Sequence, residues 1–346
     1  MTSVGYIGLD HHHREPYLET IRQLGLDVTA VAGDPDVDVS VSDQTNRYRE
    51  YETLLAAEAV DLVWITASNR TTPAVIREAV KRDIDVFCEK PGARTTAELA
   101  AIAPDVYESD ATVGFAYAWR GHPHSQQLRQ LASDGFYGNL RAVDCRFVAS
   151  RLATRDHTHY LYDPAQSRGG IVQWLGVHWI DLLGWILDER IETVAASLQY
   201  GTEAVEVEDG AIVQFETESG ATGSLTCGYY LGDDRYDTHI DILGDRGRSQ
   251  WEPISDTFAF EGDTTIELET NREWRPETPS QITHEYTPAN GYGGAWGKAF
   301  IEEFLAACDD SGTVPADIDD AIEVLSVLDA IYAAANSDRW VPVERH

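Results

Sequence analysis

The stretch 85–92, Asp-Val-Phe-Cys-Glu-Lys-Pro-Gly, constrains the fold most, because a short apolar run ends abruptly in Glu-Lys-Pro. Near-continuous hydrophobic side chains are typical of a parallel strand buried on both faces, and a proline cannot continue the ladder of hydrogen bonds. Lys90 is therefore expected at the carboxyl end of a buried strand, the edge at which open α/β sheets bind ligands. Of the 26 basic residues only three are lysines, namely Lys81, Lys90 and Lys298.

The length of 346 residues predicts two domains, each large enough to bury a core. The 59 acidic and 26 basic residues give a net charge of -33, which argues against a nucleic-acid partner, since phosphates attract Lys and Arg. With lysine scarce, this charge indicates adaptation to high salt, where screening relieves self-repulsion; an ordinary acidic enzyme is the alternative. No signal peptide opens the chain and no unbroken apolar run reaches the roughly 18 residues of a membrane span, so we expect a cytoplasmic protein with no membrane partner.

The first residues predict the opening strand and helix of a dinucleotide-binding fold. A short strand over residues 3–9 ends in glycine, and apolar positions recur on one face of the helix that follows. The glycine fingerprint is incomplete: Gly8 can serve as the first glycine, but Asp10 and His13 occupy the other two places. An aspartate adds bulk and negative charge against a pyrophosphate, so we expect a displaced or weakly bound cofactor. Ile7, Gly8, Asp10 and His13 form the predicted cofactor turn.

Three consecutive histidines, His11, His12 and His13, lie on this turn. Histidine is a common metal ligand, but adjacent histidines on a turn are not expected to converge on one ion. We predict no metal site here and a role in starting the helix or lining a pocket.

Asp34 is the residue that we expect to distinguish NAD from NADP. It follows a second apolar strand, over residues 26–32, and stands 26 residues after Gly8. An acid at this place holds a ribose 2′-hydroxyl and repels a 2′-phosphate, so NAD is favoured over NADP. The alternative is that Asp34 only opens an Asp-Pro turn.

Further strands and helices complete a right-handed βα series up to about residue 119. The strand over 61–66 ends at the ligand edge, where the predicted cofactor site continues with Thr66, Ser68, Asn69, Glu89 and Lys90. Residues 1–120 are thus predicted to be a Rossmann domain with a parallel sheet. Alternating strands and hairpin turns from residue 193 onward predict that residues 121–346 form an α+β domain with an open, mainly antiparallel sheet.

The segment 168–183 carries the second group of candidate residues. Read as a helix, it places Trp174, His178 and Asp181 on one face. A carboxylate one turn after a histidine fixes its tautomer, which makes an oriented general base. Taken alone, His178 is more often a core histidine.

The Rossmann opening, the Glu-Lys-Pro strand and the Gly169-Gly170 segment with its His-x-x-Asp resemble, in this order, the glucose-fructose oxidoreductase / inositol dehydrogenase (Gfo/Idh/MocA) family, over nearly the whole chain. The resemblance implies that a dinucleotide domain precedes an open sheet that forms the substrate pocket and the oligomer contact. It implies Lys90 as the active-site lysine, His178 as the proton-transfer residue and Asp181 as the second acid. Trp174 departs from the family, which has an aspartate there, and this indole suggests a sugar-stacking surface or altered chemistry.

We therefore expect an NAD-dependent dehydrogenase acting on a sugar, polyol or related hydroxy compound, as a homodimer or homotetramer through the C-terminal sheet. The alternatives are a redox-neutral lyase, epimerase or glycosidase with tightly bound NAD, and a non-catalytic sugar- or nucleotide-binding regulator. In the leading hypothesis His178 takes the hydroxyl proton, while Lys90 positions that oxygen and the cofactor ribose. The predicted substrate site consists of Trp119, Arg120, His157, His159, Trp174, His178 and Asp181.

Overall fold

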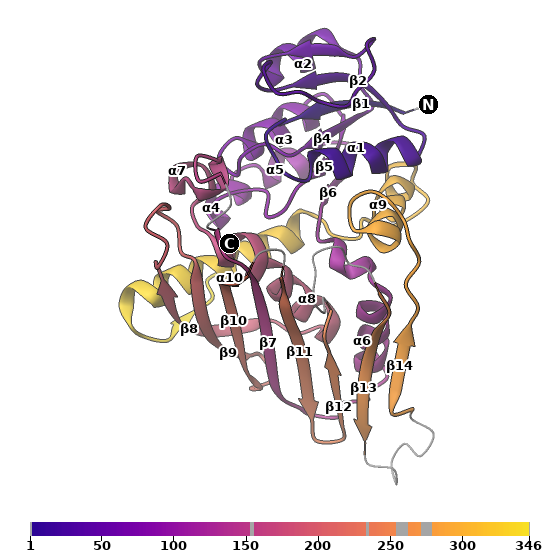
Figure 1. Cartoon of the computed structure of the whole chain (residues 1–346). Coiled ribbons are helices and arrows are strands. Elements are labelled where there is room, and N and C mark those ends of the chain that lie inside the picture. Colours follow the sequence, from indigo (N-terminus) through magenta and orange to yellow (C-terminus); the bar gives the residue numbers. More distant parts are fainter. Residues whose placement is uncertain (1, 153–155, 233–234, 254–261, 271–278, 346) are drawn as a thin grey trace.

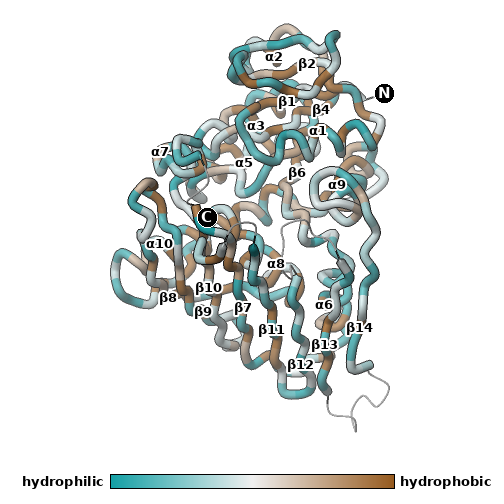
Figure 2. The backbone as a smooth tube through the Cα atoms, in the orientation of Figure 1, coloured by the Kyte–Doolittle hydropathy of each residue, from teal (hydrophilic) through white to brown (hydrophobic). Residues whose placement is uncertain are grey.

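The computed structural model describes residues 2–152, 156–232, 235–253, 262–270 and 279–345. It consists of a parallel sheet at the amino-terminal end and a larger mixed sheet below it (Figure 1). The hydrophobic stretches run along the strands of both sheets, whereas the connecting loops are largely hydrophilic (Figure 2). The predicted class, a Rossmann domain followed by an α+β domain, is confirmed.

The first sheet has the strand order β3-β2-β1-β4-β5-β6, and every pair is parallel. Its strands are β1 (Ser3–Ile7), β2 (Asp27–Ala32), β3 (Asn46–Tyr48), β4 (Leu62–Ile65), β5 (Asp85–Cys88) and β6 (Val113–Phe115). The helices that connect them are α1 (Arg14–Gln23), α2 (Tyr51–Ala57), α3 (Thr72–Val80), α4 (Thr96–Ala100) and α5 (Ala103–Tyr107). The order reverses between β1 and β4, and ligands bind at such a switch point.

Two elements of this sheet differ from the pattern that the sequence predicts. The short edge strand β3 was not predicted, because its residues Asn-Arg-Tyr are polar and partly exposed. A second short helix, α5, follows α4 and was not predicted; Pro104 stands in its first turn, where a proline is tolerated.

The second sheet has the order β14-β13-β12-β11-β7-β10-β9-β8-β15, in which only the pair β7 and β10 is parallel. Its strands are β7 (Leu140–Ser150), β8 (Ile191–Gln199), β9 (Gly210–Thr217), β10 (Thr222–Leu231), β11 (Asp237–Gly244), β12 (Gly247–Trp251), β13 (Thr264–Thr270), β14 (Gln281–His284) and β15 (Val341–Pro342). The helices that follow the first domain are α6 (Pro123–Ser133), α7 (Pro164–Ser167), α8 (Val177–Leu187), α9 (Gly294–Cys308) and α10 (Ile318–Ser337).

Helix α9, from the last quarter of the chain, lies beside the first sheet (Figure 1). The ring of Phe304 lies 5.1 Å from that of Phe87 in β5. A Cβ atom on Gly114 in β6 would come within 2.5 Å of Phe304, so only glycine allows this approach. The two ends of the chain therefore share one core beside the ligand edge of the parallel sheet.

The helix predicted over residues 168–183 is interrupted. A π-helical turn, Val172–Gly176, precedes α8. Such turns are rare and occur often at functional sites. Here the turn contains Trp174, and the helix after it contains His178.

By length and composition alone, the helical run 164–187 would be apolar enough to cross a membrane, although no single unbroken apolar stretch was evident in the sequence. Of its most apolar window, 78% is buried inside the fold. The indole of Trp179 in α8 donates a 2.8 Å hydrogen bond to the carbonyl oxygen of Arg146 in β7. The burial of this helical run and the hydrogen bond to β7 are typical of a core helix that packs on the second sheet.

Candidate active site

A cavity of about 970 Å³ lies between the carboxyl edge of the parallel sheet and the mixed sheet, whose strands β7 and β10 line it with Phe147 and Tyr229. The predicted residues Lys90, His178, Trp119, Trp174 and His159 all line it. Side chains from the cofactor turn, including His12 and His13, lie at the same cavity. The structure thus brings the Glu-Lys-Pro strand, the histidine helix and the start of the dinucleotide fold to one place.

Lys90 is buried at the end of β5. Its Nζ donates a 2.7 Å hydrogen bond to the carbonyl oxygen of Trp174 and lies 5.3 Å from the centre of that residue's ring. Oε1 of Glu89 is 3.6 Å from Nζ, which is within ion-pair distance but beyond hydrogen-bonding distance. Burial lowers the pKa of Lys90, and the charge of Glu89 opposes this change. A lysine with a lowered pKa suits proton relay.

His178 lies in α8 and is also buried. Its Nδ1 atom has no hydrogen-bond partner within the described ranges, and its ring stacks on Phe147 at 6.5 Å. Burial, followed by the nearby charge of Lys90, lowers its pKa well below the usual value. The imidazole is therefore neutral at pH 7, the state in which it can accept a proton.

Asp181 does not orient His178, contrary to the prediction from their spacing. Both of its carboxylate oxygens accept hydrogen bonds from Arg120, at 2.5 to 3.2 Å. Burial raises the pKa of Asp181 to about 6, against the opposing effect of Arg120. Arg120 also donates to Asp320 at 3.0 Å, and neither Arg120 nor Asp181 lines the large cavity. The predicted substrate roles of this pair are thus replaced by a buried ion pair behind the site.

The cofactor turn has the backbone that a dinucleotide fold needs. Gly8, directly after Ile7 at the end of β1, has φ +96°, and a Cβ atom there would lie 2.4 Å from the backbone nitrogen of Ala67. Thr66 donates a 2.6 Å hydrogen bond to the carbonyl oxygen of Gly8, which fixes the turn against the end of β4. Asp10 is exposed, and its carbonyl oxygen accepts a 2.7 Å hydrogen bond from His159. The turn is held from both domains.

Other predicted cofactor residues have partners within the protein. Ser68 donates to the side chain of Gln166, and Asn69 donates to the carbonyl oxygen of Ser167, so both tie β4 to α7 instead of facing the cavity. Asp34 is exposed just after β2, and its Oδ1 accepts a 3.0 Å hydrogen bond from the amide of Asp36. The Asp-Pro turn therefore forms, and the position at the end of β2 also fits a ribose site.

Some of the predicted substrate residues line the cavity, and others are bonded elsewhere in the protein. Trp119 stacks on Trp296 with ring centres 4.9 Å apart, and both line the cavity. Trp174 donates from its indole nitrogen to the carbonyl oxygen of Leu161 at 3.1 Å. His157 bonds instead to the carbonyl oxygen of Leu152 and does not line the cavity. Residues 153–155, which precede His157, lie outside the described residues.

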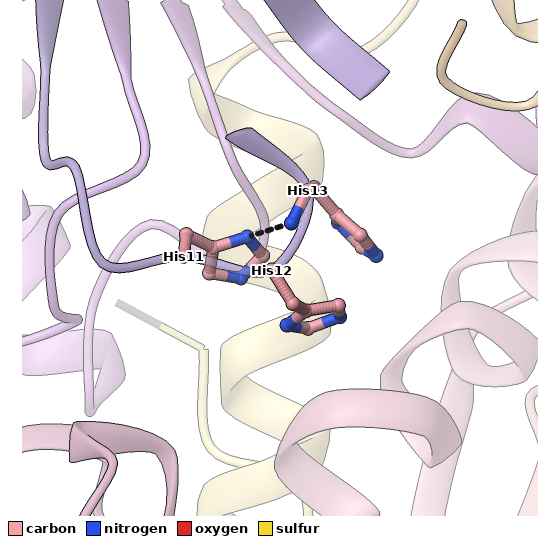
Figure 3. A group of neighbouring side chains, drawn as sticks. All are labelled: His11, His12 and His13. Carbon is pink, nitrogen blue, oxygen red and sulfur yellow. Dashed lines mark hydrogen bonds between the residues drawn. The ribbon is translucent and has the colours of Figure 1, made fainter. Parts of the chain in front are cut away.

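The three histidines of the turn gather more closely than expected (Figure 3). One ring nitrogen from each lies within 4.8 Å of the others. However, Nδ1 of His11 accepts a 3.1 Å hydrogen bond from the amide of His13, which places the proton of a neutral His11 on Nε2. Nε2 of His11 then has no lone pair for a metal, which argues against an ion at this cluster. The absence of a metal site stays a prediction.

Three residues that line the cavity or lie behind it were missed from the sequence. Tyr17 was assigned to the apolar face of the first helix, but its hydroxyl donates to Glu89. Tyr292 and Trp296 line the cavity from the start of α9. Three glycines with positive φ, at 291, 293 and 294, surround Tyr292, and this glycine cluster was the signal available in the sequence.

Comparison with known proteins places both halves of the chain. Residues 4–117 match the model of the oxidoreductase family with an NAD-binding Rossmann fold, and residues 125–250 match the GFO/IDH/MocA C-terminal domain. D-xylose 1-dehydrogenase (NADP(+)) 2 of Haloferax volcanii is 23% identical over 297 residues, which cover 86% of this chain and 85% of that one. Inositol 2-dehydrogenase of Salmonella typhimurium is 26% identical over 262 residues, or 72% of each.

Solved structures have the same fold. An oxidoreductase domain protein from Kribbella flavida superposes with a TM-score of 0.84 at 19% identity, covering both chains fully. Levoglucosan dehydrogenase in complex with NADH and levoglucosan gives a TM-score of 0.81 at 17% identity, also over both full chains.

Proposed function

Because this chain belongs to the Gfo/Idh/MocA family of oxidoreductases, we propose that it is an NAD-dependent dehydrogenase that oxidises a hydroxyl group of a neutral sugar or polyol. The observation that carries the proposal is that Lys90 and a neutral His178 line the same cavity, at the edge of the sheet where the cofactor turn lies. Relatives that act on xylose, inositol and levoglucosan support the substrate class.

The residues present fit a dinucleotide. Gly8 leaves no room for a Cβ atom and brings the backbone of the turn against the end of β4, as a pyrophosphate-binding turn requires. When bound, NAD supplies the hydride acceptor. Asp34 follows β2, and an acid at this place in a dinucleotide fold supports NAD over NADP. The xylose dehydrogenases of Haloferax volcanii and Haloarcula marismortui are named for NADP(+).

In this mechanism His178 accepts the proton of the substrate hydroxyl, because its pKa is lowered and it is neutral at pH 7. Lys90 donates a hydrogen bond to the same oxygen and stabilises the negative charge that develops there. The hydrogen bond from Lys90 to Trp174 fixes the ammonium in place. Aromatic residues around the cavity exclude water from the reacting atoms.

The charge of the cavity supports a neutral substrate. Among the described residues that line the cavity, the only ones with a basic lysine or arginine or an acidic carboxylate side chain are Lys90 and Asp156. An acidic or phosphorylated sugar would need a further cation, since carboxylates and phosphates are bound by arginine or lysine. The stacked pair of Trp119 and Trp296 instead offers flat apolar surfaces, which suit the C–H faces of a sugar ring.

The experiment is a panel of neutral sugars and polyols, matched with their acids and phosphates, assayed for NADH formation at high salt. We expect steady NADH formation with at least one neutral compound and none with the charged analogues. Redox-neutral consumption of a glycoside by protein that retains bound NAD would support the lyase, epimerase or glycosidase alternative. Sugar binding without any dinucleotide, measured by mass spectrometry and calorimetry, would support the regulator alternative.

We also propose that the chain forms a homodimer or homotetramer through the mixed sheet. Its support is a group of exposed apolar side chains on or next to neighbouring strands of that sheet, namely Tyr200 after β8, Ile212 in β9 and Tyr230 in β10. Burial of such side chains stabilises association. Light scattering of the parent and of Ile212→Glu tests it: a lower mass for the variant is expected, and a monomeric parent would contradict the proposal.

A further inference from the structure

We propose that His13 is a positioning residue for Lys90: together with Tyr17 it ties one carboxylate oxygen of Glu89, and so keeps the ion pair of Glu89 and Lys90 from closing to hydrogen-bonding distance. The proposal rests on the proposed function, because Lys90 is the group that it positions. It also gives a role to the histidine that stands at the third glycine position of the cofactor turn.

The contacts around Glu89 are asymmetric. Its Oε2 lies 3.3 Å from Nδ1 of His13 and accepts a 2.5 Å hydrogen bond from the hydroxyl of Tyr17. Because a carboxylate only accepts, His13 donates from Nδ1 in this contact. Its Oε1 is buried with no hydrogen-bond partner in the described part of the chain and lies 3.6 Å from Nζ of Lys90.

This spacing matters because Glu89 and Lys90 are both buried. Opposite charges attract strongly where water is excluded, so an unrestrained Glu89 would rotate toward the ammonium. A closed ion pair would occupy an N–H group of Lys90 that faces the cavity. It would also favour the charged form of Lys90 and raise its pKa, since Glu89 already opposes the lowering caused by burial. The two donors on Oε2 restrain the carboxylate, while Lys90 donates a hydrogen bond to Trp174.

Burial is the first cause that acts on the pKa of Glu89 and would raise it, but His13, Lys90 and His11 together hold it below its usual range. Titratable groups from several elements face Glu89. They are His11 and His13 from the cofactor turn, Tyr6 from β1, Tyr17 from α1, Cys88 and Lys90 at β5, His178 from α8, Tyr160, and Tyr292. Burial raises the pKa values of the phenols and of the thiol, so these groups stay neutral. Glu89 and Lys90 are thus opposite charges among mostly neutral groups.

A glycine at position 13 could not supply the donor. His13→Gly therefore completes the usual fingerprint at that place but releases Glu89. If His13 were only a tolerated departure from the glycine pattern, this change would affect cofactor affinity alone. Under the proposal His13→Gly also raises the pKa of Lys90.

The scarcity of lysine makes the test direct. Protein labelled with ¹³C at the ε carbon of lysine gives only three signals, from Lys81, Lys90 and Lys298, and Lys90→Met assigns the one of interest. Titration by NMR without substrate or cofactor then reports the midpoint of Lys90. We expect His13→Gly to raise this midpoint by about half a unit or more, and Tyr17→Phe to raise it in the same direction. Glu89→Gln removes the charge and is expected to lower it, while the signals of Lys81 and Lys298 serve as internal controls.

An unchanged or lowered midpoint of Lys90 in His13→Gly would overturn the proposal. Should that variant fail to fold, the midpoint of Lys90 in Tyr17→Phe tests the proposal alone. This change removes only a hydroxyl group, which is the second donor to Oε2 of Glu89. Since the titration needs no turnover, its result is independent of the dehydrogenase assignment. An absence of NADH formation with every sugar would count against the proposed function and leave this measurement valid.

Discussion

The ammonium of Lys90 donates a 2.7 Å hydrogen bond to the carbonyl oxygen of Trp174 and lies 5.3 Å from the centre of its indole ring. Lys90 follows a strand of the parallel sheet, and Trp174 lies in the π-helical turn that precedes the helix of His178. This one contact therefore joins the dinucleotide domain to the element that carries the proposed base. The indole covers the lysine with an apolar, electron-rich face.

The first prediction concerns Asp34. If its carboxylate holds the ribose, NAD binds more tightly than NADP, and Asp34→Ser narrows the difference by weakening NAD and admitting the 2′-phosphate. Calorimetry with both cofactors measures this. Equal affinities in the parent protein would reject the assignment and leave Asp34 as the opening residue of its turn.

The second prediction concerns the ion pair behind the site. Asp181→Asn removes the negative charge of the main partner of the buried Arg120 guanidinium, so that Asp320 is the carboxylate left in contact with it. Removing one partner of a buried pair costs about 3 kcal/mol of unfolding free energy. The exposed pair of Glu78 and Arg82 is the matched control, for which Glu78→Gln should cost less than about 1 kcal/mol. Urea denaturation measures both, and similar small losses would show that Arg120 does not depend on Asp181.

Much of this site could be predicted because it depends on local sequence. A buried strand that ends in Glu-Lys-Pro places Lys90 at the ligand edge, and a strand that ends in Gly8 opens a dinucleotide turn. The sequence also placed Trp174 and His178 near each other, since both lie on one helical segment.

The remaining contacts join positions far apart in the chain. Arg120 reaches Asp181 across 61 residues, and Asn69 reaches Ser167 across 98. From helical spacing alone, His178 was the predicted partner of Asp181. A buried guanidinium, however, binds a carboxylate more strongly than a neutral imidazole does. The π-helical turn was not predictable either, because no residue type marks it.

The third prediction is a loss of stability in mild acid. Burial lowers the pKa values of His11, His122 and His178 well below 6.5. As the pH falls below about 6.5, the unfolded chain binds protons that the folded chain does not, so the free energy of unfolding decreases with falling pH. Each such histidine contributes up to about 1.4 kcal/mol per pH unit below that point.

The comparison of His122→Gln with the parent isolates one histidine, because the carboxylates titrate alike in both proteins. Urea midpoints at about pH 7.5, 6.5 and 5.5, at constant high salt, should fall less steeply in the variant. Parallel curves would mean that His122 is protonated without penalty.

The fourth prediction follows from the net charge of -33. If this charge is an adaptation to salt, dilution from molar salt to tenths of molar lengthens the screening distance and strengthens the repulsion between carboxylates. The melting temperature, followed by circular dichroism, should fall over that range. A constant melting temperature would favour an ordinary acidic enzyme.

The central claim is that Lys90 and His178 act together on the substrate hydroxyl. The most direct test is the turnover number of His178→Ala on a confirmed neutral substrate, beside Lys90→Met and the double variant. We predict that each single change lowers turnover by about two orders of magnitude and that the double variant is little worse, because groups that act as a unit are not additive. Full activity of His178→Ala would show that the histidine is structural and would contradict the mechanism.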